Sequence, residues 1–323
     1  MAGGAGNASE PGKRGQNCNP LQLSCCGDPD LMQNFQDWNL QEAPLARDLD
    51  TTALNAAPVQ PRAQGAGEIS IATRRGATRL AGLRQQGSAK ILLPRTQTPD
   101  LQAVFLNTAG GITGGDHFQW QATAGDHTHL SLTTQTAERA YRAQPGQTGR
   151  LETELTLAES ARIDWLPQET ILFDRSSLAR RFTVDMAESA RLLAVESIIL
   201  GRAAMGESLI DIHFSDQWRI RRGGRLIYAD ALRLEGNVAE TTARAALLNG
   251  DRAFASIALI TPQAETLLTP LRATLPCSAG ASLIRDGVLT ARITAPDSHS
   301  LRKHLIPALE LLRGAPLPKV WTL

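Results

Sequence analysis

Aromatic residues, cysteines and long apolar runs are all scarce in this 323-residue sequence. Aromatic residues make up 4% of it, which leaves little surface for stacking on sugars. A membrane-spanning helix needs about 20 consecutive apolar residues, and neither the start of the sequence nor any later stretch approaches that length. The net charge is +1 with no long basic run, which excludes the electrostatic pattern of a nucleic-acid-binding protein. We therefore expect a cytoplasmic protein that binds neither nucleic acid nor membranes.

The cysteines are too few for a disulfide framework; they are Cys18, Cys25, Cys26 and Cys277. Three of them share the segment "CNPLQLSCC", which lacks the Cys-x-x-Cys spacing of a zinc knuckle, so free thiols are favoured over a soft-metal site. The surrounding residues are rich in Gly, Asn, Gln and Pro and show no periodic apolar pattern. We predict a disordered, dispensable extension over residues 1–65 and a folded β-rich domain over residues 66–323.

From residue 67 onward, apolar and polar residues alternate with a period of two. The pattern is clear in "EISIATRR", "RLETELTLAES", "RFTVDM" and "WRIRRGGRLIYADALRLEG". Such alternation is typical of short antiparallel strands that bury one face. The hairpin "ASLIRDGVLTARIT" is expected to turn at Asp286-Gly287.

Helices are expected only late in the chain, in "VAETTARAALLNG", "PQAETLLTPLRATLP" and "DSHSLRKHLIPALELLRG". The last of these has Asp297 or Ser298 as its N-cap and Gly314 as its stop. These C-terminal elements carry more apolar residues than one helix face needs. That surplus suggests that a partner protein covers part of them, although a cap on the end of the β body is the competing interpretation.

An internal repeat indicates stacked layers. The segment "AESARIDWLPQETILF" begins at Ala158 and recurs, with one deletion, as "AESARLLAVESIILG" from Ala187; a weaker copy begins at Ala124. Each copy is typical of a strand, a tight turn and a second strand, so the copies are predicted to stack. Coincidence among similar strand sequences is the alternative. The predicted fold is mainly β: a stacked two-layer or solenoid-like β body with a few flanking helices toward the C-terminus.

The stretch "NTAGGITGGD" at residues 107–116 looks at first like a phosphate-binding loop. A Walker loop needs a lysine after its glycines, and here Asp116 would repel phosphates; a dinucleotide fingerprint needs a different glycine spacing and a following helix. The four glycines instead predict a backbone with positive φ or very close packing; they are Gly110, Gly111, Gly114 and Gly115. We expect a close-packed turn that presents Asp116.

Four blocks resemble the urease accessory protein UreD family, called UreH in some organisms. They are "NTAGGITGGD", "LTTQTAERAYRA", "WLPQETILFDRS" and "LGRAAMGE", and the resemblance runs in order from about Gly67 to the C-terminal "PLPKVW". Thr108-Ala109 stand where many members carry proline, and the N-terminal extension matches nothing known in the family.

The resemblance implies stacked β layers flanked by helices and a non-enzymatic scaffold. Such a scaffold docks on urease apoprotein and, with UreF and the GTPase UreG, delivers nickel, which is bound only transiently. A conduit for Ni²⁺ needs oxygen or imidazole ligands that release the metal and avoids thiolate cages. The carboxylates in the matched blocks are Asp116, Glu169, Asp174 and Glu207, with Arg202 as a charge partner.

The repeat adds Glu196 to these carboxylates. An alignment of the three copies sets Gln135, Glu169 and Glu196 at one position, which would bring the two glutamates roughly 5 Å apart in adjacent layers. Two carboxylates that close favour a bridging cation, here a transient Ni²⁺, or a neutralising arginine such as Arg139 or Arg202.

Two other function classes stay open. Paired carboxylates on stacked strands would suit a glycosidase-like enzyme, although the shortage of aromatic residues disfavours sugar binding. An independent metal site at "DHTH" would use His127 and His129, which share one face of a predicted strand. Leu130 and Leu132 occupy the other face, so the histidines are expected to face solvent.

Overall fold

The computed structural model describes residues 61–202 and 205–322. The predicted extension, with Cys18, Cys25 and Cys26, lies outside the described residues up to position 60, and the predictions about it stay predictions. Cys277 is an exposed free thiol. Within the described residues, no helix has the length and apolar character that crossing a membrane requires.

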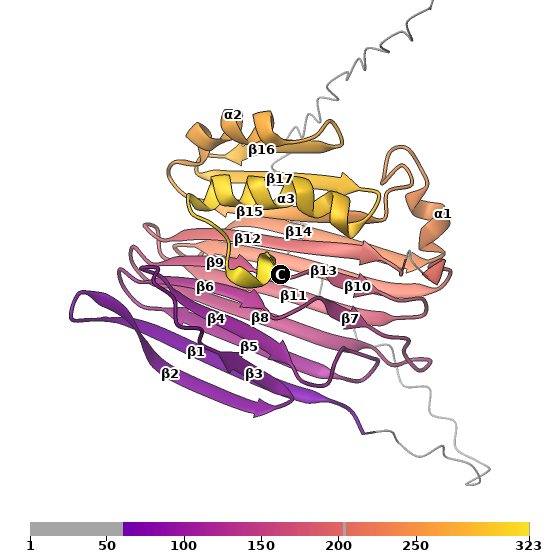
Figure 1. Cartoon of the computed structure of the whole chain (residues 1–323), viewed down its shortest axis with the longest axis horizontal. Coiled ribbons are helices and arrows are strands. Elements are labelled where there is room, and N and C mark those ends of the chain that lie inside the picture. Colours follow the sequence, from indigo (N-terminus) through magenta and orange to yellow (C-terminus); the bar gives the residue numbers. More distant parts are fainter. Residues whose placement is uncertain (1–60, 203–204, 323) are drawn as a thin grey trace, which may run out of the picture. The chain divides into compact units, whose positions relative to one another are not determined.

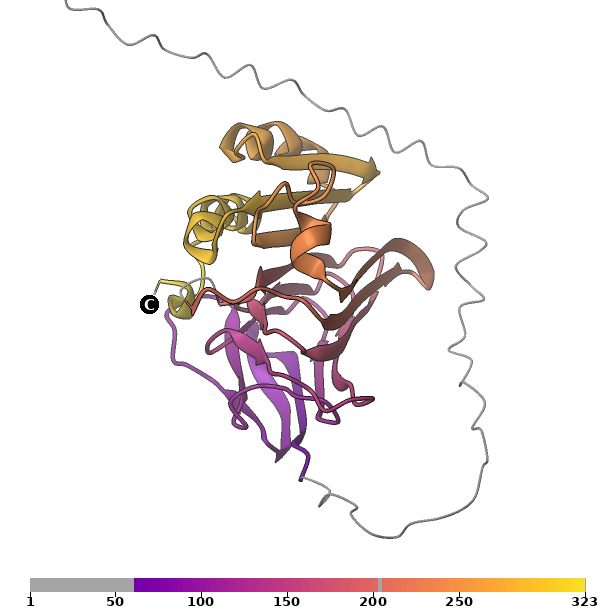
Figure 2. The same ribbon diagram turned by 90° about the vertical axis from the view of Figure 1, so that its right-hand side faces the viewer.

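The fold is mainly β, with solenoid-like stacking of strands in two facing sheets (Figures 1 and 2). The first sheet has the spatial order β14 (Arg225–Gly236), β13 (Ile212–Arg222), β11 (Ser177–Met186), β8 (Gly149–Leu157), β5 (His117–Ala124), β1 (Gln64–Arg74) and β2 (Ala77–Gly87). The second has the order β16 (Ala279–Arg285), β17 (Val288–Ala295), β15 (Ala253–Ile260), β12 (Arg191–Leu200), β9 (Arg162–Leu166), β6 (His129–Thr134), β4 (Leu101–Asn107) and β3 (Ala89–Leu92). Two short strands extend the second sheet: β7 (Glu138–Ala140) and β10 (Thr170–Leu172).

The chain alternates between the two sheets as it climbs the stack. Strands β5, β8, β11 and β13 are therefore parallel neighbours in one sheet, and β4, β6, β9 and β12 are parallel neighbours in the other. The prediction of antiparallel strands is wrong for this central part and holds only at the ends of the stack, as in β1–β2 and β13–β14. Alternation of apolar residues reports one buried and one exposed face, and in this stack parallel strands such as β11 have that pattern too.

The repeat marks successive layers, as predicted. The first strands of the three copies lie side by side, with Leu130 of β6 opposite Ile163 of β9 and Ile163 opposite Leu192 of β12. All three side chains are fully buried between the sheets. Each residue of β9 pairs with the residue of β12 that occupies the same position in the second of the two stronger copies.

Most of the aromatic side chains gather between the two sheets. Phe105 stacks on Trp120 with ring centroids 4.6 Å apart, and the Phe182 ring contacts Trp165 at 5.9 Å and Trp218 at 5.1 Å. Aromatic contacts of this kind stabilise a core beyond their buried area. Within the described residues, most aromatic side chains thus contribute to the core between the sheets.

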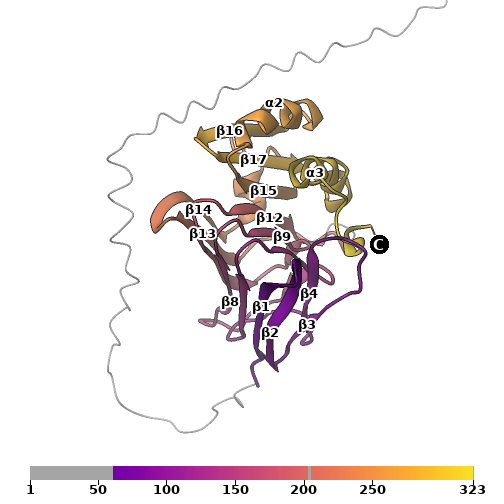
Figure 3. The same cartoon turned by 90° about the vertical axis from the view of Figure 1, so that its left-hand side faces the viewer.

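The helices of the described residues are α1 (Val238–Thr242), α2 (Ala264–Thr274), α3 (Ser298–Arg313) and the short 3-10 helix η3 (Lys319–Trp321). Helices α2 and α3 pack on the outer face of the second sheet (Figure 3), whereas Val238 of α1 belongs to the core between the sheets. Asp297 caps α3 by accepting a hydrogen bond from Ser300 N–H, and Gly314 ends the helix with a φ of 72°. The predicted N-cap, stop and Asp286-Gly287 turn are confirmed. Helix α1 is shorter than predicted.

The apolar surplus of the C-terminal elements is used inside the chain. Leu301, Leu305 and Leu309 of α3 pack in a second core against residues of β12 and β15. Trp321 joins this core, is 1% exposed, and donates a hydrogen bond from its indole N–H to Leu166 O at 3.0 Å. The capping interpretation is therefore correct for these buried residues. Leu247 and Ile284 are exposed, and the expectation that a partner covers part of the C-terminal elements stays a prediction.

Replacing Trp321 by Ala should lower the free energy of unfolding by about 3 to 5 kcal/mol, because it opens a large cavity and leaves Leu166 O without its donor. Urea unfolding measures the effect. Val320→Ala is the matched control, since Val320 is only partly buried in the same turn. A loss below about 1 kcal/mol for Trp321→Ala would show that the tail is a loosely attached segment.

Candidate functional site

Four loops meet at one end of the stack, where β4, β7, β10 and β12 finish. They cover residues 107–116, 141–148 and 173–176, and residues 201–202 with 205–211. Backbone hydrogen bonds join them: Tyr141 N–H donates to Ile112 O at 2.8 Å, and Gly201 N–H donates to Leu172 O at 2.8 Å. Since successive parallel strands end at the same edge, the four sequence blocks quoted above come together here.

Three of these loops, all but residues 107–116, line an open cleft of about 530 Å³, here called the motif cleft. It is lined by Tyr141, Arg142, Phe173, Asp174, Arg175, Arg202 and Glu207. The Arg202 guanidinium lies 4.3 Å from the centroid of the Phe173 ring, and Tyr141 meets the same ring edge-on at 5.1 Å. Tyr141 and the neighbouring Met205 are exposed, so the cleft presents apolar and cationic groups together.

An ion pair between Arg202 and Glu207 holds the last loop. Glu207 accepts hydrogen bonds from the Arg202 backbone N–H and Nε at 2.9 Å and from its Nη2 at 3.0 Å, and also from Asp174 N–H at 3.1 Å. The hydrogen bonds from Arg202 are the main cause that lowers the pKa of Glu207 to about 2. Asp174 in turn accepts from the backbone N–H groups of Ile210 and Asp211. The structure thus brings Asp174, Arg202 and Glu207 together, with Arg202 as the predicted charge partner.

The glycine-rich loop is a close-packed turn, as predicted. Gly110 and Gly115 have φ values of 83° and 88°, and a side chain on Gly114 would meet Gln147 O. The expectation that the turn presents Asp116 is wrong. Asp116 is 5% exposed, and its carboxylate accepts hydrogen bonds at 2.8 Å from the N–H groups of Ala63 and Thr113. The carboxylate therefore fastens the turn to the strand that follows Ala63.

The two glutamates of the repeat lie on opposite faces of the second sheet. Trp165 pairs with Ala194, but Thr170 pairs with Ile198 rather than with Ile199, which sets Glu169 level with Ser197 and not with Glu196. A slip of a single position turns a side chain to the other face. The predicted carboxylate pair is therefore wrong, and Gln135 is not level with Glu169 either, because Thr170 pairs with Glu138.

Each of these glutamates has its own arginine. Glu169 faces α3, where it accepts hydrogen bonds from Arg302 at 3.0 Å and from Ser298 at 3.2 Å. Glu196 points between the sheets and forms ion pairs, together with Asp216, to the buried Arg180. Burial raises the pKa of Glu196 to about 7, although Arg180 acts in the opposite direction. Arg139 and Arg202, the partners considered from the sequence, contact neither carboxylate.

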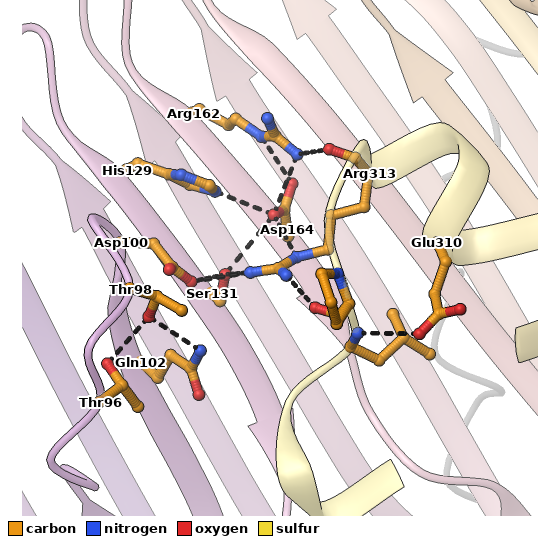
Figure 4. Close-up of polar contacts among 12 residues, drawn as sticks. Thr96, Thr98, Asp100, Gln102, His129, Ser131, Arg162, Asp164, Glu310 and Arg313 are labelled. Carbon is orange, nitrogen blue, oxygen red and sulfur yellow. Dashed lines mark hydrogen bonds and ion pairs between the residues drawn. The ribbon is translucent and has the colours of Figure 1, made fainter. Parts of the chain in front are cut away.

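The two histidines do not share a strand face. His127 lies in the turn before β6, with a φ of 56°, and is exposed as expected. His129 begins β6 and has its Nε2 2.9 Å from the buried carboxylate of Asp164 (Figure 4). Arg162 and Arg313 donate to the same carboxylate. Although burial alone would raise the pKa of Asp164, the hydrogen bond from His129 and the charge of Arg162 hold it below its usual range.

Arg313 ties the end of α3 to the second sheet through this network. Its Nη2 donates to Asp100 at 2.8 Å and to Ser131 Oγ at 2.9 Å, while its Nε donates to Asp164 at 3.0 Å (Figure 4). The sequence did not single out Arg313 or Arg302, since their partners lie far away along the chain. Both arginines lie on a predicted amphipathic helix. A charged residue on the apolar face of such a helix is a pattern that could have indicated a buried ion pair.

Across residues 61–202 and 205–322, no three His, Cys, Asp or Glu side chains gather closely enough to hold a metal ion. The predicted carboxylates instead accept hydrogen bonds from arginines or backbone N–H groups. The arrangement can position an ion pair, an aromatic floor and exposed apolar side chains at one end of the stack. These are the features of a surface that docks another protein.

Glu138 is a further, partly buried carboxylate beside the glycine-rich loop. It accepts hydrogen bonds from Asn107 Nδ2 at 3.3 Å and from Arg139 N–H at 3.1 Å. Burial raises its pKa to about 7, since these hydrogen bonds only partly compensate for the loss of water. Glu138 lies in the second quoted block, within "TAERAYRA". Its place in that block was a reason to consider it from the sequence, and the sequence analysis did not do so.

Glu138→Gln should stabilise the protein above pH 7 and leave it unchanged near pH 4.5. A carboxyl whose pKa is raised on folding contributes stability at low pH that is lost as the pH rises through about 7. The neutral amide oxygen still accepts a hydrogen bond, so we expect a gain of about 1 to 3 kcal/mol at pH 8.

Urea unfolding at pH 4.5, 6 and 8 measures this difference. Glu154→Gln is the control, because Glu154 is an exposed carboxylate on the outer face of the first sheet. A Glu138→Gln difference that is the same at all three pH values would show that the carboxyl is not perturbed by burial.

Comparisons with known proteins agree with the geometry. The family model for the UreD urease accessory protein matches residues 63–322. The urease accessory protein UreD of Rhizobium rhizogenes is 50% identical over 271 residues, which cover 83% of this chain and 98% of the relative. Those of Rhizobium leguminosarum bv. trifolii and Ruegeria pomeroyi are each 49% identical, over 83% and 75% of this chain and 98% and 94% of the relative. The chain therefore belongs to the UreD family of urease accessory proteins.

Proposed function

We propose that this chain is a urease maturation factor that acts as a scaffold and catalyses no reaction itself. In this proposal it binds urease apoprotein together with UreF and the GTPase UreG in the cytoplasm. It helps to deliver nickel to the urease active site and holds the metal only in passing. The surface used for docking is the motif cleft with its surrounding loops.

One observation carries the proposal: the four sequence blocks that resemble the family converge on a single end of the stack. Three of them contribute Tyr141, Phe173 and Arg202 to one open cleft, and the fourth meets it where the Tyr141 hydroxyl donates to Gly110 O at 3.2 Å. Exposed aromatic, methionine and arginine side chains are enriched in protein interfaces. The relatives carry the name of accessory proteins, which supports a scaffold rather than an enzyme.

Nickel would pass through oxygen ligands that bind it weakly. The candidates remain Asp116, Glu169, Glu196 and Glu207, with His127 and His129 as weaker ones. Each of these carboxylates already accepts hydrogen bonds from arginines or N–H groups, so a nickel ion would compete with existing donors. That competition favours transient over tight binding and suits a protein that passes a metal on.

The two rival classes gain no specific support. The carboxylates that share a site are bound to buried arginines, Glu196 and Asp216 to Arg180 and Asp100 and Asp164 to Arg313. Neither pair matches the substrate-accessible pair of a glycosidase. An independent metal-binding protein would retain nickel when purified alone, whereas the proposed scaffold would not.

Arg202→Ala should weaken assembly with the urease apoprotein and UreF by roughly 10-fold or more. Removal of the guanidinium leaves Glu207 without its main partner and loosens the loop at residues 205–211. Co-purification from cells that express all the subunits measures assembly, and urease activity in the same extracts should fall in parallel.

Arg181→Ala is the matched control. Arg181 forms a comparable ion pair with Glu152, but on the outer face of the first sheet. Its assembly and urease activity should equal those of the unmodified chain. Wild-type assembly and activity for Arg202→Ala would refute the motif cleft as the docking surface.

Glu207→Gln separates the nickel role from docking. The amide keeps the shape of the side chain and an acceptor for Arg202, so assembly should be at least half that of the unmodified chain. If Glu207 is a transient ligand, the nickel content of the resulting urease should fall several-fold. Normal nickel content in a normally assembled complex would remove Glu207 from the proposed path.

A further inference from the structure

A second cleft lies at the other end of the stack, away from the motif cleft. It has a volume of about 540 Å³ and is lined by Glu188, Arg222, Arg225, Ile227, Arg285 and Asp286. These residues come from three turns, those between β11 and β12, β13 and β14, and β16 and β17. Strand β11 starts beside the motif cleft at Ser177 and ends next to this one at Met186. We call it the arginine cleft.

Glycines in these turns let the chain approach the arginines closely. Gly223 and Gly224 have φ values of 56° and 77°, which permits the tight turn that places Arg222 and Arg225 on either side. In the third turn, Gly287 has a φ of 73°, and a side chain there would lie 3.2 Å from an Arg222 Nη1 atom. The turns therefore leave room around the guanidinium groups.

The guanidinium groups in the arginine cleft are poorly satisfied. Arg222 has a single acidic neighbour, Glu188, with Nε and Oε2 3.5 Å apart, and the Glu188 side chain is 70% exposed. Exposed pairs of this kind contribute little. Within residues 61–202 and 205–322, the side chains of Arg225 and Arg285 have no hydrogen-bond or ion-pair partner.

Several buried and part-buried arginines of the fold are instead bound within the chain. Arg180, Arg302 and Arg313 each donate several hydrogen bonds to carboxylates or carbonyls. A guanidinium has five N–H donors in a planar fork that fits carboxylate and phosphate oxygens. Three such groups against two carboxylates leave the arginine cleft with a net positive charge and many unused donors.

We propose that the arginine cleft binds an oxyanion with two or more negative charges, in the form of carboxylate or phosphate groups. The buried Ile227 forms an apolar wall, and Arg222, Arg225 and Arg285 donate to the ligand oxygens. Glu188 and Asp286 at the same cleft repel an extended polyanion, so the ligand is a small oxyanion or a short acidic peptide segment. A small oxyanion and an acidic peptide would both present carboxylate or phosphate oxygens to the same guanidinium groups.

Isothermal titration calorimetry on the full chain at low salt tests the proposal with three probes: pyrophosphate, citrate and a hexaglutamate peptide. We expect saturable binding of at least one probe, weakened 10-fold or more in the double variant Arg225→Ala/Arg285→Ala. Both arginines are exposed, so the variant should unfold at the same temperature as the unmodified chain. Added salt should weaken binding, since the contacts are between charges near the surface.

Arg84→Ala is the control, because Arg84 is an exposed arginine on β2, far along the first sheet. Binding that is 10-fold tighter for the peptide assigns the cleft to an acidic segment of a partner protein, and tighter binding of pyrophosphate or citrate assigns it to a small oxyanion. No binding of any probe at millimolar concentration, or equal binding by the double variant, would overturn the proposal.

Discussion

The parallel pairing of successive strands is the constraint on which the rest of this structure depends. After each pass through both sheets, the chain begins a new strand in register beside the previous strand of the same sheet. The pairing of β6, β9 and β12 shows this. All turns of one kind are therefore gathered at one end of the stack. Blocks that are far apart in sequence then form a single surface without any long-range element to hold them.

Buried arginines attach the remaining parts to this stack. Arg180 joins the two sheets through Glu196 and Asp216, while Arg302 and Arg313 fasten α3 to the second sheet through Glu169, Asp100 and Asp164. Carboxylates such as Glu169 and Glu196, which the sequence suggested as metal ligands, thus hold the sheets and the helix together. A buried ion pair gives less stability than its geometry suggests, but it specifies one arrangement of the sheets and the helix.

Local patterns in the sequence predicted the local structure well. The repeat predicted the layers, Asp297 and Gly314 marked the ends of α3, and the glycine-rich loop has the predicted conformation. Strand direction was not predictable, because it depends on how the chain crosses between sheets. The facing of Glu169 and Glu196 turned on the number of residues inserted between the copies: the single insertion sets Glu169 level with Ser197, and two would be needed to reach Glu196.

Backbone hydrogen–deuterium exchange tests the central claim, that the convergent loops form the working surface, most directly. The chain is measured alone and in complex with urease apoprotein and UreF. The account predicts slower exchange in the complex for residues 107–116, 141–148, 173–176 and 205–211, which surround the motif cleft. Unchanged exchange in all four loops, with slower exchange confined to other surfaces of the stack, would contradict it.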